Sequence, residues 1–243
     1  MEKRHWYVLL TYIIMHFSSI LGVPLLYNLG VRPKEEAIAY WLIYSFFTAM
    51  VIILLLLRKD MQVTEQRKDK STISVALLWS IAGVFLALFS QGIAAAIESQ
   101  LFGIEPGSEN TDVLIEFARI TPLFIVVTSI IGPILEEIIF RKLLFGNLHK
   151  RFNFFISALL SSFIFGIVHM DFSHILIYTA MGFTFAFLYV RTKRIIVPII
   201  AHVSMNTLVI LIQLVYKEDI EKYQEQLETM QSFITLFLFN VSL

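Results

Sequence analysis

Residues 121–145 read TPLFIVVTSIIGPILEEIIFRKLLF, a mostly apolar run whose ionisable residues are a pair of adjacent acids and a pair of adjacent bases. A run of this length can cross a bilayer as a helix, which needs about 20 apolar residues. Ionisable side chains deep in such a helix cost roughly 2.5 kcal/mol or more each, and they persist where they pair or line a wet cavity. The stretch therefore predicts a membrane-spanning fold with a polar site inside it.

The rest of the chain has the composition of a membrane protein. Its 243 residues are 57% hydrophobic and 16% charged, with a mean hydropathy of +0.75, whereas soluble domains are nearer half apolar and a quarter charged. The formal net charge is zero, so no global basic field points to nucleic acid. The absence of cysteine excludes disulfides, thiolate metal sites and a cysteine nucleophile.

A scan with a window of about 19 residues predicts an all-α polytopic transmembrane helix bundle with about seven spans. A last apolar segment, Phe233–Leu243, has roughly half the length that a span needs, and we interpret it as an interfacial or packed end. The seven blocks are Trp6–Tyr27, Ala37–Leu57, Ile73–Ile97, Thr121–Phe145, Phe154–Met170, Ile175–Val190 and Ile195–Tyr216.

The organisation predicted from these blocks is a single membrane domain over residues 1–243. Residues 1–112 hold the three N-terminal helices, residues 113–216 hold a core with the buried polar side chains, and residues 217–243 form an outer loop and tail. Loops are short, and neither an internal repeat nor a low-complexity linker divides the chain.

The distribution of cations predicts the orientation. Most Lys and Arg residues fall on one side if the N-terminus is inside, and the positive-inside rule assigns that side to the cytoplasm. We therefore expect a multi-pass protein of the cell membrane with a cytoplasmic N-terminus. The cations on the predicted inner side are Lys3, Arg4, Arg58, Lys59, Arg67, Lys68, Lys70, Arg141, Lys142, Lys150, Arg151, Arg191, Lys193 and Arg194.

The fourth block carries an acid without a partner. Glu137 and Arg141 are four residues apart, so they share a helix face and can neutralise each other. Glu136 lies about 100° away around the helix axis and has no such cation. Pro133 frees the carbonyl of Ser129 and can kink the helix. The backbone beside the unpaired acid is therefore expected to be bent or opened.

Two other blocks carry polar residues at depth. His169 ends the fifth block, while His202 and Asn206 are four residues apart in the seventh and share a face. A glutamate and a histidine together can take a proton from water and return it to a leaving amine. Histidine and asparagine can hold a metal, or donate hydrogen bonds to a developing oxyanion. A single histidine such as His16, in the first block, is interpreted as a packing or hydrogen-bonding residue.

Taken together and in order, these residues resemble the CAAX-protease and bacteriocin-processing (CPBP, or Abi) intramembrane proteases. The resemblance covers roughly residues 122–214, and all three motifs of the family are matched on three different predicted spans. The matching motifs are Glu136-Glu137-xxx-Arg141, Phe165-xxx-His169 and His202-xxx-Asn206.

The resemblance implies hydrolysis of a peptide bond within or at the membrane, by a membrane-embedded peptidase. It implies that Glu136 activates water together with His169, and that His202 and Asn206 stabilise the oxyanion. The Glu137–Arg141 pair would fix the helix and the orientation of Glu136.

The resemblance leaves the cofactor and the substrate open. The family has been described both as metalloproteases and as metal-independent glutamate proteases, and a divalent metal such as zinc would take His169 and His202 as ligands. The expected partners are the lipid bilayer and a peptide or membrane-protein substrate, with no nucleic acid, and the oligomeric state is not predicted. Two other functions stay open: a non-proteolytic, peptide-binding immunity or maturation factor, and an ion-coupled transporter that uses Glu and His as a relay.

Overall fold

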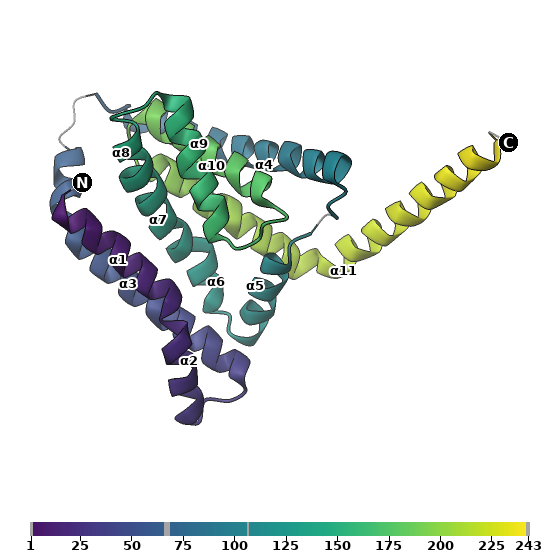
Figure 1. The fold of residues 1–243 in the computed structure, drawn as a ribbon, viewed down its shortest axis with the longest axis horizontal. Coiled ribbons are helices and arrows are strands. Elements are labelled where there is room, and N and C mark those ends of the chain that lie inside the picture. Colours follow the sequence, from purple (N-terminus) through teal and green to yellow (C-terminus); the bar gives the residue numbers. More distant parts are fainter. Residues whose placement is uncertain (1, 66–68, 106, 242–243) are drawn as a thin grey trace. The chain divides into compact units, whose positions relative to one another are not determined.

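The computed structural model describes residues 2–65, 69–105 and 107–241, and within these ranges the chain is helical with no strand. This confirms the all-α fold (Figure 1). The helices are α1 (Lys3–Phe17), α2 (Ser19–Asn28), α3 (Lys34–Glu65), α4 (Ile73–Phe102), α5 (Glu109–Ile120), α6 (Phe124–Val126), η1 (Val127–Ile131), α7 (Gly132–Glu136), η2 (Glu137–Phe145), α8 (Gly146–Leu148), α9 (Phe154–Val168), α10 (Ile175–Thr192) and α11 (Ile196–Val241).

Several helices are long and apolar enough to cross a membrane, so the protein is a multi-pass membrane protein. α1 and α2 together make one further span if the 44° bend between them is included. α9 is apolar but shorter, and the helical stretch from α6 to α8 is built of short α and π segments. The number of seven spans therefore stays a prediction. Among the described residues, the four long spans are Lys34–Asp60, Ile73–Phe102, Ile175–Thr192 and Ile196–Tyr216.

The first predicted span is divided in two at Ser18. The Ser18 hydroxyl turns back and donates to the carbonyl of Met15 at 2.8 Å. The same hydroxyl oxygen accepts the indole N–H of Trp41 on α3 at 3.0 Å. Serine side chains that bond into the helix backbone are a known cause of bends, and here the bend separates α1 from α2.

The helix around Pro133 is wound more loosely than an α-helix. The turns before and after it, η1 and η2, are π-helical, and the N–H of Gly132 bonds to the carbonyl of Val127, five residues back. Single π-helical turns are frequent at functional sites. The opening expected at Pro133 thus takes the form of wide turns and does not break the helix.

Helices pack against the Pro133 helix from two sides. On one side, α9 and α10 both contact η2 and lie directly against each other (Figure 1). They approach closely because both have small residues where they cross: a Cβ on Gly182 would come within 2.8 Å of the Cβ of Ser162. Small residues at helix crossings let backbones approach closely in membranes. On the other side, Tyr12 of α1, Ile53 of α3 and Phe140 of η2 belong to one buried cluster.

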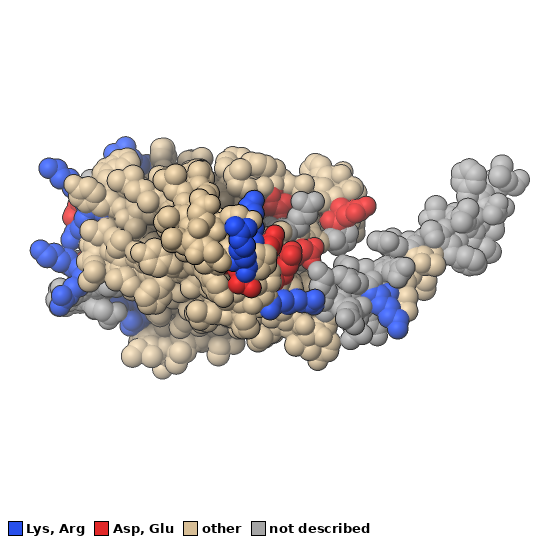
Figure 2. Space-filling model, turned by 90° about the horizontal axis from the view of Figure 1, so that it is seen from below, with Lys and Arg blue, Asp and Glu red and all other residues tan. Residues whose placement is uncertain are grey.

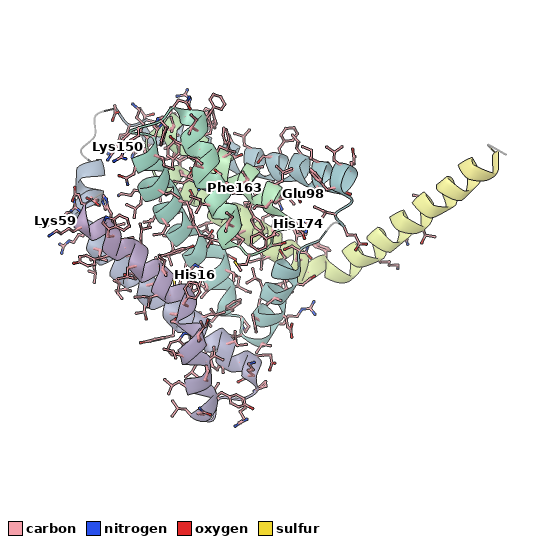
Figure 3. The ribbon with its side chains drawn as sticks, viewed as in Figure 1. His16, Lys59, Glu98, Lys150, Phe163 and His174 are labelled. Atoms are coloured by element: carbon pink, nitrogen blue, oxygen red, sulfur yellow. The ribbon has the colours of Figure 1, made fainter. Side chains whose placement is uncertain are left out.

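The surface of the described residues separates apolar from charged side chains. Leu55, Phe85 and Phe89 are each about two-thirds exposed, at 67%, 69% and 69%, as expected for side chains that face lipid. Lys59 and Lys150 lie at the same end as the N-terminus (Figure 3). Figure 2 shows Lys and Arg gathered there, next to a broad surface without charge. The segments predicted to be cytoplasmic therefore share one end of the molecule.

The chain divides into two compact units, Met1–Thr207 and Leu208–Leu243. All the predicted site residues belong to the first unit. The second unit is helical as far as Val241, with non-helical backbone angles at Tyr216. We expected an outer loop and tail after that residue, but the stretch is rich in Glu, Gln and Lys and has no Gly or Pro, a composition that favours helix.

Candidate active site

Three elements of the first unit supply the predicted site residues. Glu136 ends α7 and Glu137 begins η2. His169 caps the C-terminus of α9, and His202 lies in the first turns of α11. The wide turns of η1 and η2 therefore place two successive carboxylates beside the start of α11.

His202 lies between the two glutamates. Its Nδ1 is 3.0 Å from Oε1 of Glu137, and its Nε2 is 3.7 Å from Oε2 of Glu136. The first distance is a hydrogen bond, whereas the second is too long for one. The ring of Phe185 on α10 stacks on the imidazole, with centroids 4.5 Å apart. His202 is therefore held on one side by Glu137 and turns its other nitrogen toward Glu136.

Glu137 and Arg141 form a buried ion pair, as predicted from their spacing. Arg141 Nε lies 3.3 Å from Glu137 Oε2, and neither side chain is exposed. The guanidinium also lies over the ring of Phe165 at 4.9 Å, a favourable cation–π distance. Glu137 thus contacts a cation through one oxygen and His202 through the other.

Glu136 differs from its neighbour in that it is accessible. Its side chain is 19% exposed, against 0% for Glu137. This difference follows from the rotation of about 100° per residue that separates adjacent side chains on a helix. Of these two acids, only Glu136 can meet water or a substrate.

His169 is oriented by the end of its own helix and by an aromatic ring. Its Nδ1 donates to the carbonyl of Phe165 at 2.8 Å, so Nε2 carries the lone pair that can accept a proton. The ring stacks on Tyr178 of α10, with centroids 4.1 Å apart and planes 25° apart. Phe165 contacts the rings of both His169 and His202, at 4.5 and 6.1 Å. The two histidines therefore flank one phenylalanine.

Asn206 reaches the loosely wound turn before Pro133. Its Nδ2 lies 3.5 Å from the carbonyl of Thr128 in η1, at the outer limit of a hydrogen bond. A carboxamide has two N–H groups, so one of them is left for another acceptor.

The two site histidines were inferred from the sequence as optional metal ligands. Among the described residues, no three His, Asp or Glu side chains converge as metal ligands. His202 already bonds through Nδ1 to Glu137 and His169 through Nδ1 to Phe165. These bonds use Nδ1 and leave the Nε2 atoms of both rings without a hydrogen bond to a described residue, so metal ligation by His169 and His202 stays an option inferred from the sequence.

Two features near the site were not predicted from the sequence. His16 and Tyr12, on α1, both lie within electrostatic reach of Glu136. Glu98, one residue past the third predicted block, is buried within α4: it accepts the backbone N–H of Leu176 at 3.0 Å and contacts Nδ1 of His174 at 2.9 Å (Figure 3). The sequence feature that could have pointed to α1 as part of the site is the spacing of Tyr12 and His16, which are four residues apart in a predicted span.

The stacking of Tyr178 on His169 leads to a first prediction. Tyr178→Leu removes the stacked ring and frees the His169 imidazole to rotate, so we expect the kcat of the peptidase activity implied by the motifs to fall about tenfold. Tyr178→Phe keeps the ring and is expected to retain most of the activity. The measurement is kcat and KM for both variants on one fluorogenic peptide. An equal loss of kcat in the two variants would show that the stacked ring does not account for the contribution of Tyr178 to activity.

Comparisons with known proteins give matches over most of the chain. The family described as Type II CAAX prenyl endopeptidase Rce1-like matches residues 118–208. The chain is 50% identical over 246 residues to the putative membrane peptidase YdiL of Bacillus subtilis (strain 168), covering 98% of this chain and 100% of the relative. It is 35% identical over 235 residues to the membrane-embedded CAAX protease MroQ of Staphylococcus aureus (strain USA300), covering 92% and 95%. No solved structure gives a significant match.

Proposed function

The chain belongs to the Rce1-like CAAX protease family and is a membrane-embedded peptidase, and from this premise we propose which of its residues hydrolyse the peptide bond. Glu136 and His169 activate water, and His202 and Asn206 stabilise the oxyanion. The observation that carries this proposal is the accessibility of Glu136, which is 19% exposed beside a fully buried neighbour. The family resemblance inferred from the motifs is confirmed, while the roles of single residues are proposals.

Water activation needs a base that is accessible and oriented. Glu136 supplies the carboxylate, and the Nε2 lone pair of His169 is available because Nδ1 is bonded to Phe165. As the water oxygen attacks the carbonyl carbon, its proton passes to Glu136. Such general base catalysis contributes about 10²–10⁴-fold to a rate.

The oxyanion of the tetrahedral intermediate needs hydrogen-bond donors. His202 turns Nε2 toward Glu136, and when that nitrogen carries a proton it can donate to the oxyanion. Asn206 contributes the N–H that Thr128 does not use. One donor of this kind typically accounts for about 10²–10³-fold in kcat.

The buried ion pair positions these groups. Glu137 accepts from Nδ1 of His202 and contacts Arg141, which fixes the ring of His202 and the start of η2. Because Glu136 is the preceding residue, the same contacts set the direction of its side chain. This agrees with the positioning role expected from the sequence.

The proposed substrate is a membrane-associated protein or peptide. Two relatives carry the words CAAX or peptidase in their names, and the long apolar helices keep the site at the membrane. The cations gathered at one end of the molecule (Figure 2) support a cytoplasmic location for the N-terminus by the positive-inside rule.

The test of this function is cleavage by the purified protein in lipid nanodiscs, with a library of quenched fluorescent peptides. In water enriched in ¹⁸O, hydrolysis is expected to place one ¹⁸O atom in the new carboxyl group, as read by mass spectrometry. His169→Gln, assayed beside the wild type, should lose the activity while still binding peptide. A wild type that binds peptides and cleaves none would overturn the proposal and favour the peptide-binding factor.

A metal chelator is the matched control in the same assay. Since no three described acids or histidines converge as ligands, we expect the initial rate to stay within about twofold after chelation, a change of less than roughly 0.5 kcal/mol in the barrier. A loss that added zinc restores would show that the working site differs from this arrangement of side chains.

A further inference from the structure

α1 runs antiparallel to the motif-bearing helix, and this direction brings His16 level with Glu136. Near the start of α1, Arg4 lies within electrostatic reach of Lys142. Two turns further on, the rings of Tyr12 and Phe140 are 6.1 Å apart. From this contact, one further turn along α1 leads from Tyr12 to His16, and one turn back along the other helix leads from Phe140 to Glu136. Both steps go in the same direction in space, so His16 lies level with Glu136.

Electrostatics support this register. The groups that act on His16 are Glu136 on α7 and His169 on α9, the two residues proposed to activate water. On its own helix His16 contacts the ring of Tyr12 at 4.6 Å, and on α3 it meets the ring of Phe46 at 5.7 Å. Figure 3 shows His16 between α1 and the α6–α7 stretch.

His16 is an exposed residue, and its ring nitrogens are unpaired within the described part of the chain. The residue is exposed, although Tyr12 one turn before it is buried. Within the described part of the chain, no hydrogen bond involves either ring nitrogen of His16. Ionisable residues in spans face the interior or a water-filled cavity rather than lipid. A histidine that only packed against its neighbours would be covered, or would bond to another helix.

We propose that His16 is a third histidine of the peptidase site, which relays a proton from Glu136 to the leaving amine. This role rests on the proposed function of Glu136 and His169. The other proposed site residues lie within residues 118–208, the region that matches the family. His16 lies on α1, outside that region, so the proposal adds the N-terminal helix to the site.

The relay balances in protons and bonds. Water gives one proton to Glu136 as its oxygen bonds to the carbonyl carbon. When the C–N bond breaks, the Glu136 carboxyl passes that proton to one nitrogen of His16, while the other nitrogen gives its proton to the amine. One water is consumed, and the new carboxyl and amine are released. Glu136 is again ionised, and His16 is again neutral but carries its proton on the other nitrogen. Proton exchange with water restores the starting tautomer.

The test uses His16→Ala with chemical rescue, after the wild type has been shown to cleave a fluorogenic peptide. We expect kcat to fall about 100-fold, the range of a lost acid–base group, with KM within about twofold. Added imidazole should restore the rate, whereas pyrazole, which has the same size but is a much weaker base, should not. Rescue by both molecules, or by neither, would overturn the relay.

Two further variants separate a catalytic role from packing. His16→Phe keeps an aromatic ring against Tyr12 and Phe46, so we expect wild-type thermal stability with the same loss of kcat; full activity in this variant would overturn the proposal. His149→Phe is the matched control, because His149 stacks on Phe145 and lies 13 residues beyond Glu136. It should keep the wild-type rate.

A readout that needs no activity distinguishes this inference from the proposed function. With ¹⁵N-labelled histidine, the titration of the His16 ring should change when Glu136→Gln removes the neighbouring charge, and that of His149 should not. An active wild type with an unchanged His16 titration would refute the relay alone. An inactive wild type with a changed titration would refute the peptidase assignment of Glu136 while keeping His16 beside it.

Discussion

Glu136→Gln is expected to give a folded protein that no longer cleaves peptides. The amide has almost the shape of the carboxylate, but it cannot accept the proton of the attacking water. The loss of a general base corresponds to about 10²–10⁴-fold in rate, which would take kcat to the detection limit of a fluorogenic assay. Peptide binding should remain, because the side chain keeps its size and polarity.

The stability of this variant should stay close to that of the wild type. Glu136 is 19% exposed and lies 3.7 Å from His202, so it makes no hydrogen bond that the substitution would break. We expect a change of less than about 0.5 kcal/mol in the free energy of unfolding. The measurement is a thermal unfolding curve in the same nanodiscs as the activity assay. Residual cleavage above a few per cent would mean that another group activates the water.

Glu137→Gln is the matched control one residue away. Glutamine at this position still offers an oxygen to Nδ1 of His202, but it removes the negative charge opposite the buried Arg141. Activity and stability should therefore fall together in this variant, in contrast to Glu136→Gln. If both variants lost activity without losing stability, we would conclude that Glu136 and Glu137 both take part in the proton transfer from water.

The spacing of residues predicted the contacts within single helices. The Glu137–Arg141 pair and the separate direction of Glu136 follow from the geometry of one helix, which needs no knowledge of tertiary packing. The turns around Pro133 were expected to open, and they are π-helical. Local chemistry of this kind can be derived from a sequence, because its causes lie within four or five residues.

Contacts between helices were less predictable. The hydrogen bond from His202 to Glu137 joins residues 65 positions apart, and only the set of motifs pointed to it. Glu98 lies one residue past the third predicted block, and the sequence did not indicate that it caps the start of α10 from within α4. The neighbours of a single histidine such as His16 could not be predicted. The periodicity of apolar residues indicates which face of a helix is buried, but it does not indicate which helix packs against that face.

Helix ends were the other source of error. Ser18 divides the first predicted span into α1 and α2, because its hydroxyl bonds into the preceding turn. α5 was not predicted as a helix; it begins where Ser108 accepts the N–H of Thr111, a capping interaction. Hydropathy averaged over about 19 residues does not resolve a bend at one residue or a helix of 12 residues such as α5.

Arg141→Met is expected to destabilise the protein more than either glutamate substitution does. Arg141 and Glu137 are both fully buried, and methionine leaves the Glu137 carboxylate without its cation. Breaking a buried pair from one side typically costs about 3–5 kcal/mol. The variant also loses the contact of the guanidinium with Phe165, 4.9 Å away. The free energy of unfolding, or the midpoint of thermal unfolding in nanodiscs, measures this loss.

The double variant Glu137→Gln with Arg141→Met shows whether the loss comes from an unpaired charge. It contains no buried ion at these positions, and glutamine still accepts from His202, so most of the stability should return; replacing a buried ion pair by neutral groups is often nearly neutral in free energy. Activity should return only in part, because His202 then lacks a carboxylate partner. A double variant as unstable as Arg141→Met would mean that arginine stabilises the helix by packing against Phe165 and Phe185 rather than by neutralising Glu137. The ion pair would then not be the element that orients Glu136.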